Sequence, residues 1–247
     1  MTLTIENLGG ISFPEVFPYI QKARTNNVDK NNTLVIATPH NGIIDPNCAA
    51  SREALIMHVV KMRDVIPVYF RNCNIARARN DLFEYAYKIR ADILFIDSDM
   101  EFSTSDYDIL VNAEKDVVSA LCFKRKFPYT PCAFNFTNHR RQAAIKTIHK
   151  QIFQADACGM AFCLIRNNII RLMTSSYITK MLGKPFNHLQ DNFEDQLEED
   201  ISFCMRLNII NIPVWVIPNT SVLHAGRGYL DFINYNKEET NKIDLSN

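Results

Sequence analysis

One short stretch decides the fold, the run Asp92-Ile93-Leu94-Phe95-Ile96-Asp97-Ser98-Asp99. Its residues 93–96 are all apolar, and acidic residues flank them. An apolar run without alternation is typical of a central parallel strand that helices cover on both faces. The run therefore predicts a buried strand over residues 92–97, with polar side chains where the strand ends.

Strand and helix patterns alternate on both sides of this run. Strands are expected at 33–38, 65–70 and 116–123, and helices at 49–62, 74–89 and 106–113. Pro39 is expected to stop the first strand, and Asn74 is a suitable N-cap for the second helix. Alternation of this kind predicts a doubly wound α/β sheet.

The pattern changes after residue 123. The later segments are expected to be short strands near 132–136 and 151–153, a buried strand at 158–165, a helix from Asn167, a polar loop from 183, a helix over 199–207, and strands at 212–217 and 221–224. We expect a single domain over residues 1–247. It would consist of halves at 33–123 and 124–228, with peripheral extensions at 1–32 and 229–247.

The composition favours a soluble globular enzyme. The chain has 247 residues, of which 47% are hydrophobic and 22% charged. Lys and Arg together number 27, as do Asp and Glu, so no overall basic field predicts nucleic-acid or membrane binding. No apolar stretch approaches the roughly 18–20 residues of a spanning helix, and the start lacks a basic end followed by an apolar block. A cytoplasmic location is therefore expected, in the host cytoplasm if the source is viral.

The seven cysteines are scattered and include no Cys-x-x-Cys pair. Most lie within apolar runs, such as Ala120–Phe123 and Gly159–Cys163. This pattern indicates reduced thiols in the core, rather than a zinc site or a disulfide framework.

The first candidate site is Asp97-Ser98-Asp99. In an open α/β sheet, ligands bind outside the carboxyl ends of the strands, where these residues are expected. Two carboxylates two residues apart can reach one Mg²⁺ or Mn²⁺, whose remaining positions are often filled by substrate phosphates. The alternative is a polar turn that caps the following helix.

The second candidate is Arg77-Ala78-Arg79-Asn80, in the first turns of the helix after Asn74. Helix N-terminal amides together with guanidinium groups favour an anion such as a diphosphate. A solvated basic face is the alternative.

The third candidate site contains acidic residues, and the fourth contains a histidine. Glu198-Glu199-Asp200 opens a helix, where a carboxylate can serve as a general base or can simply favour the helix dipole. His224-Ala225-Gly226-Arg227-Gly228 leaves a late strand, and His224 can supply a nitrogen ligand. The alternative for His224 is an ordinary surface histidine.

Taken in order, these segments resemble the GT-A-fold glycosyltransferases, and most closely the family 2-like branch common among viral and bacterial proteins. The resemblance covers residues from about 33 to 228. It is carried by five segments, Ile36–Pro39, Ala76–Asn80, Leu94–Met100, Glu199–Cys204 and Leu223–Gly226. The sequence departs from the family at Cys158-Gly159-Met160, where a second glycine is common, and in its unmatched start.

The resemblance implies a mixed, mostly parallel central sheet flanked by helices, and a metal-dependent hexosyl- or pentosyltransferase. The donor would be a nucleoside-diphosphate sugar, with a UDP-sugar expected, and the acceptor a glycan or glycoprotein. The implied donor or nucleotide-binding residues are Thr38, Pro39, Arg77, Arg79, Asn80, Asp97 and Ser98. The implied ligands of Mn²⁺ or Mg²⁺ are Asp99, Asp97 and His224.

The expected reaction inverts the anomeric carbon. Glu199 or Asp200, with Asp200 the expected base, would take the proton of the acceptor hydroxyl as it attacks. Two alternatives stay open. A nucleotidyltransferase also needs a carboxylate pair and a metal, but it usually has a Gly- and Lys/Arg-rich loop after the first strand. A non-catalytic sugar- or nucleotide-binding module could keep the fold without the reaction.

Overall fold

The computed structural model describes residues 32–72, 74–124, 130–136, 142–145, 150–190 and 196–224. In chain order its elements are β1 (Thr33–His40), α3 (Pro46–Val59), β2 (Asp64–Arg71), α4 (Ile75–Lys88), β3 (Asp92–Ile96), β4 (Met100–Glu101), α5 (Thr104–Asn112), β5 (Val117–Ala120), β6 (Ala133–Phe136), β7 (Gln142–Ala144), β8 (Phe153–Ala155), β9 (Ala157–Cys158), β10 (Phe162–Ile165), α6 (Asn167–Thr174), α7 (Ser176–Leu182), α8 (Glu199–Ile209), β11 (Val214–Ile217) and β12 (Leu223–His224). The predicted extensions lie outside these residues except for Asn32, so the proposed division of the chain stays a prediction.

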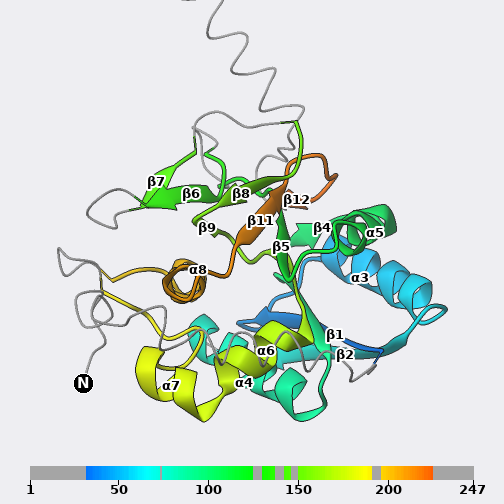
Figure 1. Cartoon of the computed structure of the whole chain (residues 1–247). Helices are drawn as coiled ribbons and strands as arrows, with labels where there is room; N and C mark the ends of the chain where they lie inside the picture. Colours follow the sequence, from blue (N-terminus) through cyan, green and yellow to red (C-terminus); the bar gives the residue numbers. More distant parts are fainter. Residues whose placement is uncertain are drawn as a thin grey trace, which may run out of the picture.

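A seven-stranded sheet runs through the described structure in the order β2-β1-β3-β10-β5-β11-β8 (Figure 1). Strands β2, β1 and β3 are parallel, and β11 is parallel to β5. Strand β10 is antiparallel to both β3 and β5, and β8 is antiparallel to β11. The sheet is therefore mixed and mostly parallel, as predicted. Two small sheets, β12-β4 and β7-β6-β9, lie beside it.

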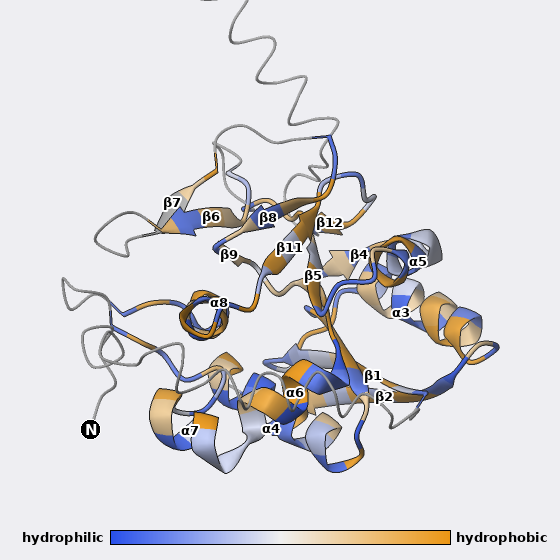
Figure 2. Ribbon diagram, in the orientation of Figure 1, coloured by the Kyte–Doolittle hydropathy of each residue, from blue (hydrophilic) through white to orange (hydrophobic). Residues whose placement is uncertain are grey.

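Strand β3 has apolar residues on both faces because both faces are covered. Ile93 and Phe95 belong to the core formed with α4, α6, α7 and α8, whereas Leu94 and Ile96 belong to the core formed with α3 and α5. All four side chains are fully buried. In Figure 2 the central strands β5 and β11 are coloured as hydrophobic, while α3 and α4 show both colours. The unbroken apolar run thus predicted the strand's environment correctly.

Pro39 does not end β1, contrary to the prediction. The strand continues to His40, which pairs with Arg71 of β2. Pairing with β3 on the other side stops at Ala37. Pro39 therefore has a neighbouring strand on one side only, and a residue without an N–H is tolerated at such an edge.

Local signals explain where helices begin, but they misplaced some boundaries. The Asn74 side chain accepts a hydrogen bond from the Arg77 N–H at 2.8 Å, which confirms the predicted cap of α4. Helix α3 starts earlier than predicted, because Asp45 caps it and Pro46 occupies its first position. The helix expected from Asn167 divides at Ser175 into α6 and α7.

The cysteines within the described residues are free thiols. Cys48, Cys122, Cys158, Cys163 and Cys204 are buried and Cys132 is half-buried, while Cys73 lies outside the described residues. The predicted packing of these thiols is confirmed. Within the same residues, the helices are too short or too polar to cross a bilayer.

Four phenylalanines attach α8 to the sheet. Phe186 stacks on Phe203 of α8 with ring centroids 4.6 Å apart, and it meets the edges of Phe83 of α4 and Phe95 of β3 at 5.6 and 5.5 Å. Phe186 is fully buried. Because α8 carries Glu199 and Asp200 at its first turn, this cluster determines where those acids lie.

We expect Phe186→Ala to lower the free energy of unfolding by about 3–5 kcal/mol, because it leaves a cavity among three rings. Urea denaturation at pH 7 measures the change. Met57→Ala, an exposed position on α3, serves as the control and should cost about 0.5 kcal/mol or less. A loss below about 1 kcal/mol for Phe186→Ala would mean that the cluster does not hold α8.

Candidate functional site

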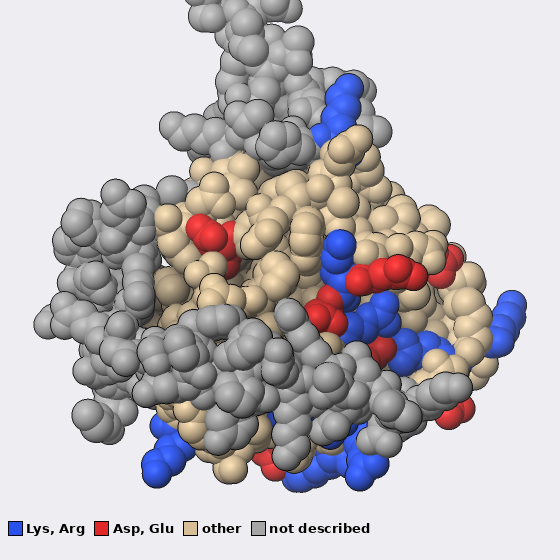
Figure 3. All heavy atoms as spheres, in the orientation of Figure 1, with Lys and Arg blue, Asp and Glu red and all other residues tan. Residues whose placement is uncertain are grey.

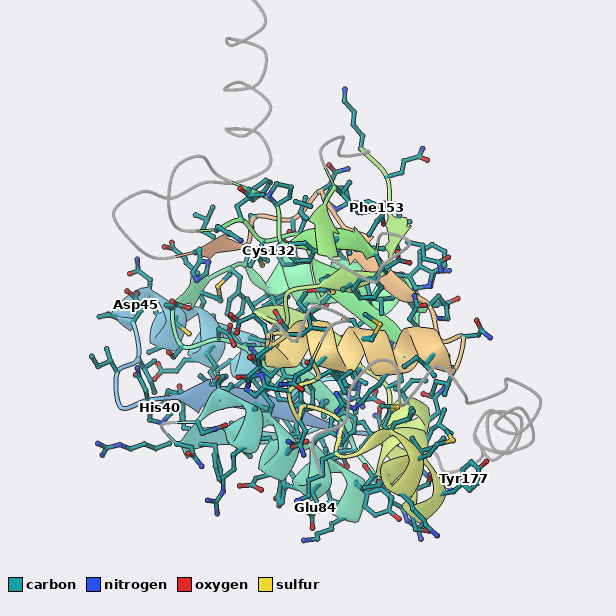
Figure 4. The ribbon with its side chains drawn as sticks, turned by 90° about the vertical axis from the view of Figure 1, so that its left-hand side faces the viewer. His40, Asp45, Glu84, Cys132, Phe153 and Tyr177 are labelled. Carbon is teal, nitrogen blue, oxygen red and sulfur yellow. The ribbon has the colours of Figure 1, made fainter. Side chains whose placement is uncertain are left out.

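The turn after β3 is held in place by its backbone. The Asp97 N–H donates to the Ala161 carbonyl at 2.9 Å, and the Met100 N–H donates to the Asp97 carbonyl at 3.2 Å. The Ser98 carbonyl accepts from the Asp45 N–H at 2.8 Å, which joins this turn to the start of α3. Figure 4 shows His40, at the carboxyl end of β1, and Asp45 on the same side of the molecule. The predicted position of Asp97–Asp99 at the carboxyl edge of the sheet is therefore confirmed.

Arg79 joins this turn to helix α8. Its guanidinium pairs with Asp97 at 2.8 Å and with Glu199 at 3.2 Å, and it donates to the Met160 carbonyl at 3.2 Å. Only 2% of Arg79 is exposed. One buried cation thus connects three segments that are distant in the sequence.

Burial alone would favour the neutral form of Arg79. The carboxylates of Asp97, Glu199 and Asp200 outweigh that effect and raise the pKa of the guanidinium above its ordinary value. The Phe95 ring lies 5.4 Å from the guanidinium carbon and adds a cation–π contact. Arg79 is therefore a permanent positive charge beneath the acidic groups.

Asp200 is set apart from its neighbour Glu199. Burial and the nearby Glu199 charge raise the pKa of Asp200 to about 7, although Arg79 and the Ile201 N–H partly oppose the shift. A Cβ atom on Gly159 would lie 3.2 Å from the Cys132 Cβ atom and 3.8 Å from an Asp200 carboxylate oxygen, so the backbone of this glycine packs closely beside the acid. A half-buried carboxyl with a pKa near neutrality is suited to take and return a proton.

Asp99 and His224 form the second charged group of the site. The Nε2 atom of His224 lies 3.3 Å from an Asp99 carboxylate oxygen, and its Nδ1 atom lies 3.2 Å from the Phe123 carbonyl. Strand pairing of β12 with β4 places His224 opposite Met100. A carbonyl only accepts hydrogen bonds, so Nδ1 carries the hydrogen in the contact with Phe123, and Nε2 is the ring nitrogen that faces Asp99.

This pair has the chemistry of a metal site. Histidine ligands usually donate their other ring N–H to a carbonyl or carboxylate, as His224 does to Phe123. Among the described residues no group of three His, Cys, Asp or Glu side chains could together hold an ion. A divalent ion here would therefore have two side-chain ligands, and oxygens of water or of a bound diphosphate would complete its shell.

Thr38 and Pro39 are buried at the end of β1. The Thr38 hydroxyl has no hydrogen-bond partner among the described residues, which is uncommon for a fully buried polar atom. Figure 3 views the molecule from the other end of the parallel strands, where acidic and basic side chains lie side by side. At the carboxyl end, β1 has a buried hydroxyl without a partner among the described residues.

Two predicted residues lie apart from this group. Arg77 is 75% exposed at its side chain and pairs with Asp81 at 3.8 Å, which fits the alternative of a solvated basic face. The Asn80 amide accepts from the Phe186 N–H at 3.0 Å and donates to Asn187 at 3.1 Å. Asn80 therefore positions the segment that carries Phe186, instead of presenting its amide to a nucleotide as predicted.

Ser119 and Gly159 were not predicted from the sequence. The buried Ser119 hydroxyl donates to the Gly159 carbonyl at 2.9 Å and so holds the glycine next to Asp200. A single glycine inside an apolar run often marks a close approach of the backbone, and that signal was present at Cys158-Gly159-Met160. Ser119 left no comparable signal.

We expect Arg79→Met to lower the free energy of unfolding by about 3–5 kcal/mol, because it leaves two carboxylates near each other without their shared cation. The double variant Arg79→Met/Glu199→Gln should recover part of the loss, since one of those charges is gone. Urea denaturation measures both. Arg77→Met, two residues earlier on the exposed face, should change stability by about 0.5 kcal/mol or less. Equal losses for Arg77→Met and Arg79→Met would contradict the bridging role.

Asp200 should make stability decrease with rising pH. The unfolded carboxyl loses its proton near pH ~4, whereas the folded one keeps its proton to about pH 7. Between these values the folded chain holds the extra proton, so this contribution is complete below pH ~4 and is lost as pH rises through 7. Melting temperatures from pH 5 to 9 should therefore show Asp200→Asn gaining on the original chain as pH rises. The melting temperature of Glu198→Gln, a variant at the exposed neighbouring position, should change with pH as that of the original chain does. A difference between Asp200→Asn and the original chain that does not change with pH would contradict the raised pKa of Asp200.

Comparisons with known proteins give distant structural likenesses. The sequence matches no protein-family model, and no curated protein is similar to it in sequence. Among solved structures, the chain is similar to GalNAc-T7 in complex with UDP, GalNAc and Mn²⁺, with 10% identity and a TM-score of 0.49. The likeness covers 81% of this chain but only 45% of the GalNAc-T7 chain.

Proposed function

We propose that this chain is a metal-dependent glycosyltransferase with a GT-A-like fold, which transfers a sugar from a nucleoside-diphosphate sugar to a hydroxyl acceptor. The observation that carries the proposal is the arrangement at the end of β3. There Asp99, two residues after Asp97, pairs with His224, and both side chains are of the kind that can bind a metal ion. Arg79 pairs with Asp97 and with Glu199, which precedes Asp200 in the first turn of α8. A UDP-sugar donor and a glycan or glycoprotein acceptor are part of the proposal through the sequence resemblance. A cytoplasmic location is part of it through the hydropathy and cysteine patterns of the sequence.

Asp99 and His224 are the proposed ligands of a Mn²⁺ or Mg²⁺ ion, and that ion would offset negative charge on the departing diphosphate. Asp97 has a different role, because one of its oxygens pairs with Arg79 at 2.8 Å. It keeps the turn attached to the buried cation and leaves its second oxygen for the donor or the ion. Thr38, with its unpaired hydroxyl, is the proposed contact to the nucleoside part.

Asp200, rather than Glu199, is the proposed base. Glu199 is 6% exposed and its carboxylate pairs with Arg79, which keeps it from an acceptor. Asp200 has a pKa near 7, is only half-buried, and has the backbone of Gly159 instead of a side chain beside its carboxylate. It takes the proton of the acceptor hydroxyl while that oxygen forms a bond to the anomeric carbon.

The reaction then proceeds in one displacement. As the new carbon–oxygen bond forms, the bond from the anomeric carbon to the diphosphate breaks, and the diphosphate leaves with the electron pair. Attack opposite the leaving group inverts the anomeric carbon. Asp200 holds the proton at the end of the step and releases it to solvent.

The alternative of a nucleotidyltransferase finds less support. Residues 41–45, which follow β1, are Asn41-Gly42-Ile43-Ile44-Asp45 and contain no Lys or Arg for a triphosphate. A binding module without activity would have no use for an acid whose raised pKa costs stability at neutral pH.

We expect UDP with Mn²⁺ to raise the melting temperature of the original chain, because a ligand of the folded state stabilises it. Asp99→Asn should lose most of that increase. Asp108→Asn is the matched control, since Asp108 pairs with His58 at 3.0 Å on the surface between α3 and α5. It removes an acid from a similar Asp–His pair and should keep the response.

Hydrolysis of UDP-sugars by the purified chain tests the reaction itself. Activity that depends on Mn²⁺ and disappears in Asp99→Asn would support the transferase. Failure of every nucleoside diphosphate to shift the melting temperature, or equal loss in Asp108→Asn, would overturn the proposed site.

A further inference from the structure

The strand that carries His224 has a very short ladder. Strand β12 pairs with β4 through two residue pairs, Leu223 with Glu101 and His224 with Met100. A two-stranded ladder of this length is marginally stable at best in water by itself. Its register nevertheless matters for the site, because a shift by one residue would turn His224 to the opposite face of the strand and away from Asp99.

Asp106, in the first turn of α5, joins the two segments just beyond this ladder. When the antiparallel register is continued outward, Ser221 comes opposite Ser103, and their hydroxyl oxygens lie 3.2 Å apart. One Asp106 oxygen accepts from the Ser221 N–H at 2.8 Å, and the other accepts from the Ser221 hydroxyl at 2.7 Å. The second oxygen also accepts from the N–H of Ser103 at 2.8 Å and from its hydroxyl at 2.9 Å. The carboxylate therefore fastens Ser221 to Ser103 in the same register as β12 and β4.

Capping of α5 accounts for only part of this arrangement. Ser103 and Asp106 form a capping box, which requires bonds between these two residues alone. Ser221 lies 115 residues further along the chain and has no part in that box. Asp106 is 1% exposed, so hydrogen bonds from the protein must replace the water that its carboxylate has lost. Two of the four bonds that do so come from Ser221.

We propose that Asp106 is a positioning residue for the metal site, because it holds the register of β12 against β4 and so keeps His224 facing Asp99. This inference rests on the proposed function, in which Asp99 and His224 bind the ion. Removal of a group that orients a metal ligand from outside the coordination shell typically costs roughly 10–100-fold in metal affinity. Asp106 acts on the backbone that carries the ligand, whereas the Phe123 carbonyl contacts the imidazole ring itself.

Calorimetric titration of the full chain with Mn²⁺ tests the inference. We expect Asp106→Ala to weaken Mn²⁺ binding about tenfold or more. Ser221→Ala, at an exposed position, removes only the hydroxyl donor. It should weaken binding less, and it retains the test if Asp106→Ala does not fold.

Ser103→Ala is the matched control. It removes a hydroxyl donor from the same carboxylate but leaves both bonds between Asp106 and Ser221. It should bind Mn²⁺ nearly as the original chain does. Equal weakening in Ser103→Ala and Asp106→Ala would overturn the inference, because loss of the α5 cap would then explain both.

NMR spectra of the metal-free chain report the position of His224 without an ion. Asp106→Ala should shift the ring signals of His224 and leave those of His188, which contacts the Leu197 carbonyl, unchanged. Unchanged His224 signals and unchanged Mn²⁺ affinity in Asp106→Ala would overturn the role of Asp106 and leave the proposed metal site intact. Absence of Mn²⁺ binding by the original chain would instead overturn the proposed metal site, and the His224 signals would still decide whether Asp106 holds the strand.

Discussion

The described structure depends on one buried cation, the guanidinium of Arg79. It lies between Asp97 at the end of β3 and Glu199 at the start of α8, two acids a hundred residues apart in the sequence. Two carboxylates this close would repel each other, and removing either from water costs free energy. The shared cation makes their proximity stable, so the turn after β3 and the first turn of α8 can meet. The aromatic contacts of Phe186 and Phe203 then hold α8 against the sheet from its apolar side.

The same network gives chemically similar acids different properties. Glu199 is paired and buried, Asp97 is paired and half-buried, and Asp200 has a pKa near 7 and no ion pair among the described residues. Asp99 pairs with His224. Environment thus separates a structural acid, the proposed base and the proposed metal ligand, as it separates carboxylates in acid–base enzymes generally.

Much of the fold could be predicted because the signals are local. The apolar run of β3, the Asn74 cap and the strand–helix alternation each depend on neighbours within a few residues. The insertion of β10 between β3 and β5 could not be predicted, because its direction follows from long-range pairing that leaves no periodic signal. The prediction that β1 ends at Pro39 was wrong for a related reason: whether a proline is tolerated depends on where the neighbouring strand stops.

In the site, the grouping of Asp97, Arg79 and Glu199 could be expected from motif order. Residues two apart on a helix point in roughly opposite directions, but which of Arg77 and Arg79 is buried required the packing to be known.

The raised pKa of Asp200 also bears on the position of this proposed base. An acid with a pKa near 7 weakens the fold at neutral pH, so a position that served only stability would favour an amide or an apolar side chain. Moving Asp200 closer to Arg79 would stabilise its anion, but it would lower the pKa and remove its capacity to hold a proton near neutrality. Glu199 occupies the position closer to Arg79, and its carboxylate offsets part of the Arg79 charge that would otherwise act on Asp200. The pairing of Glu199 with Arg79 therefore helps to keep the pKa of Asp200, the proposed base, near neutrality.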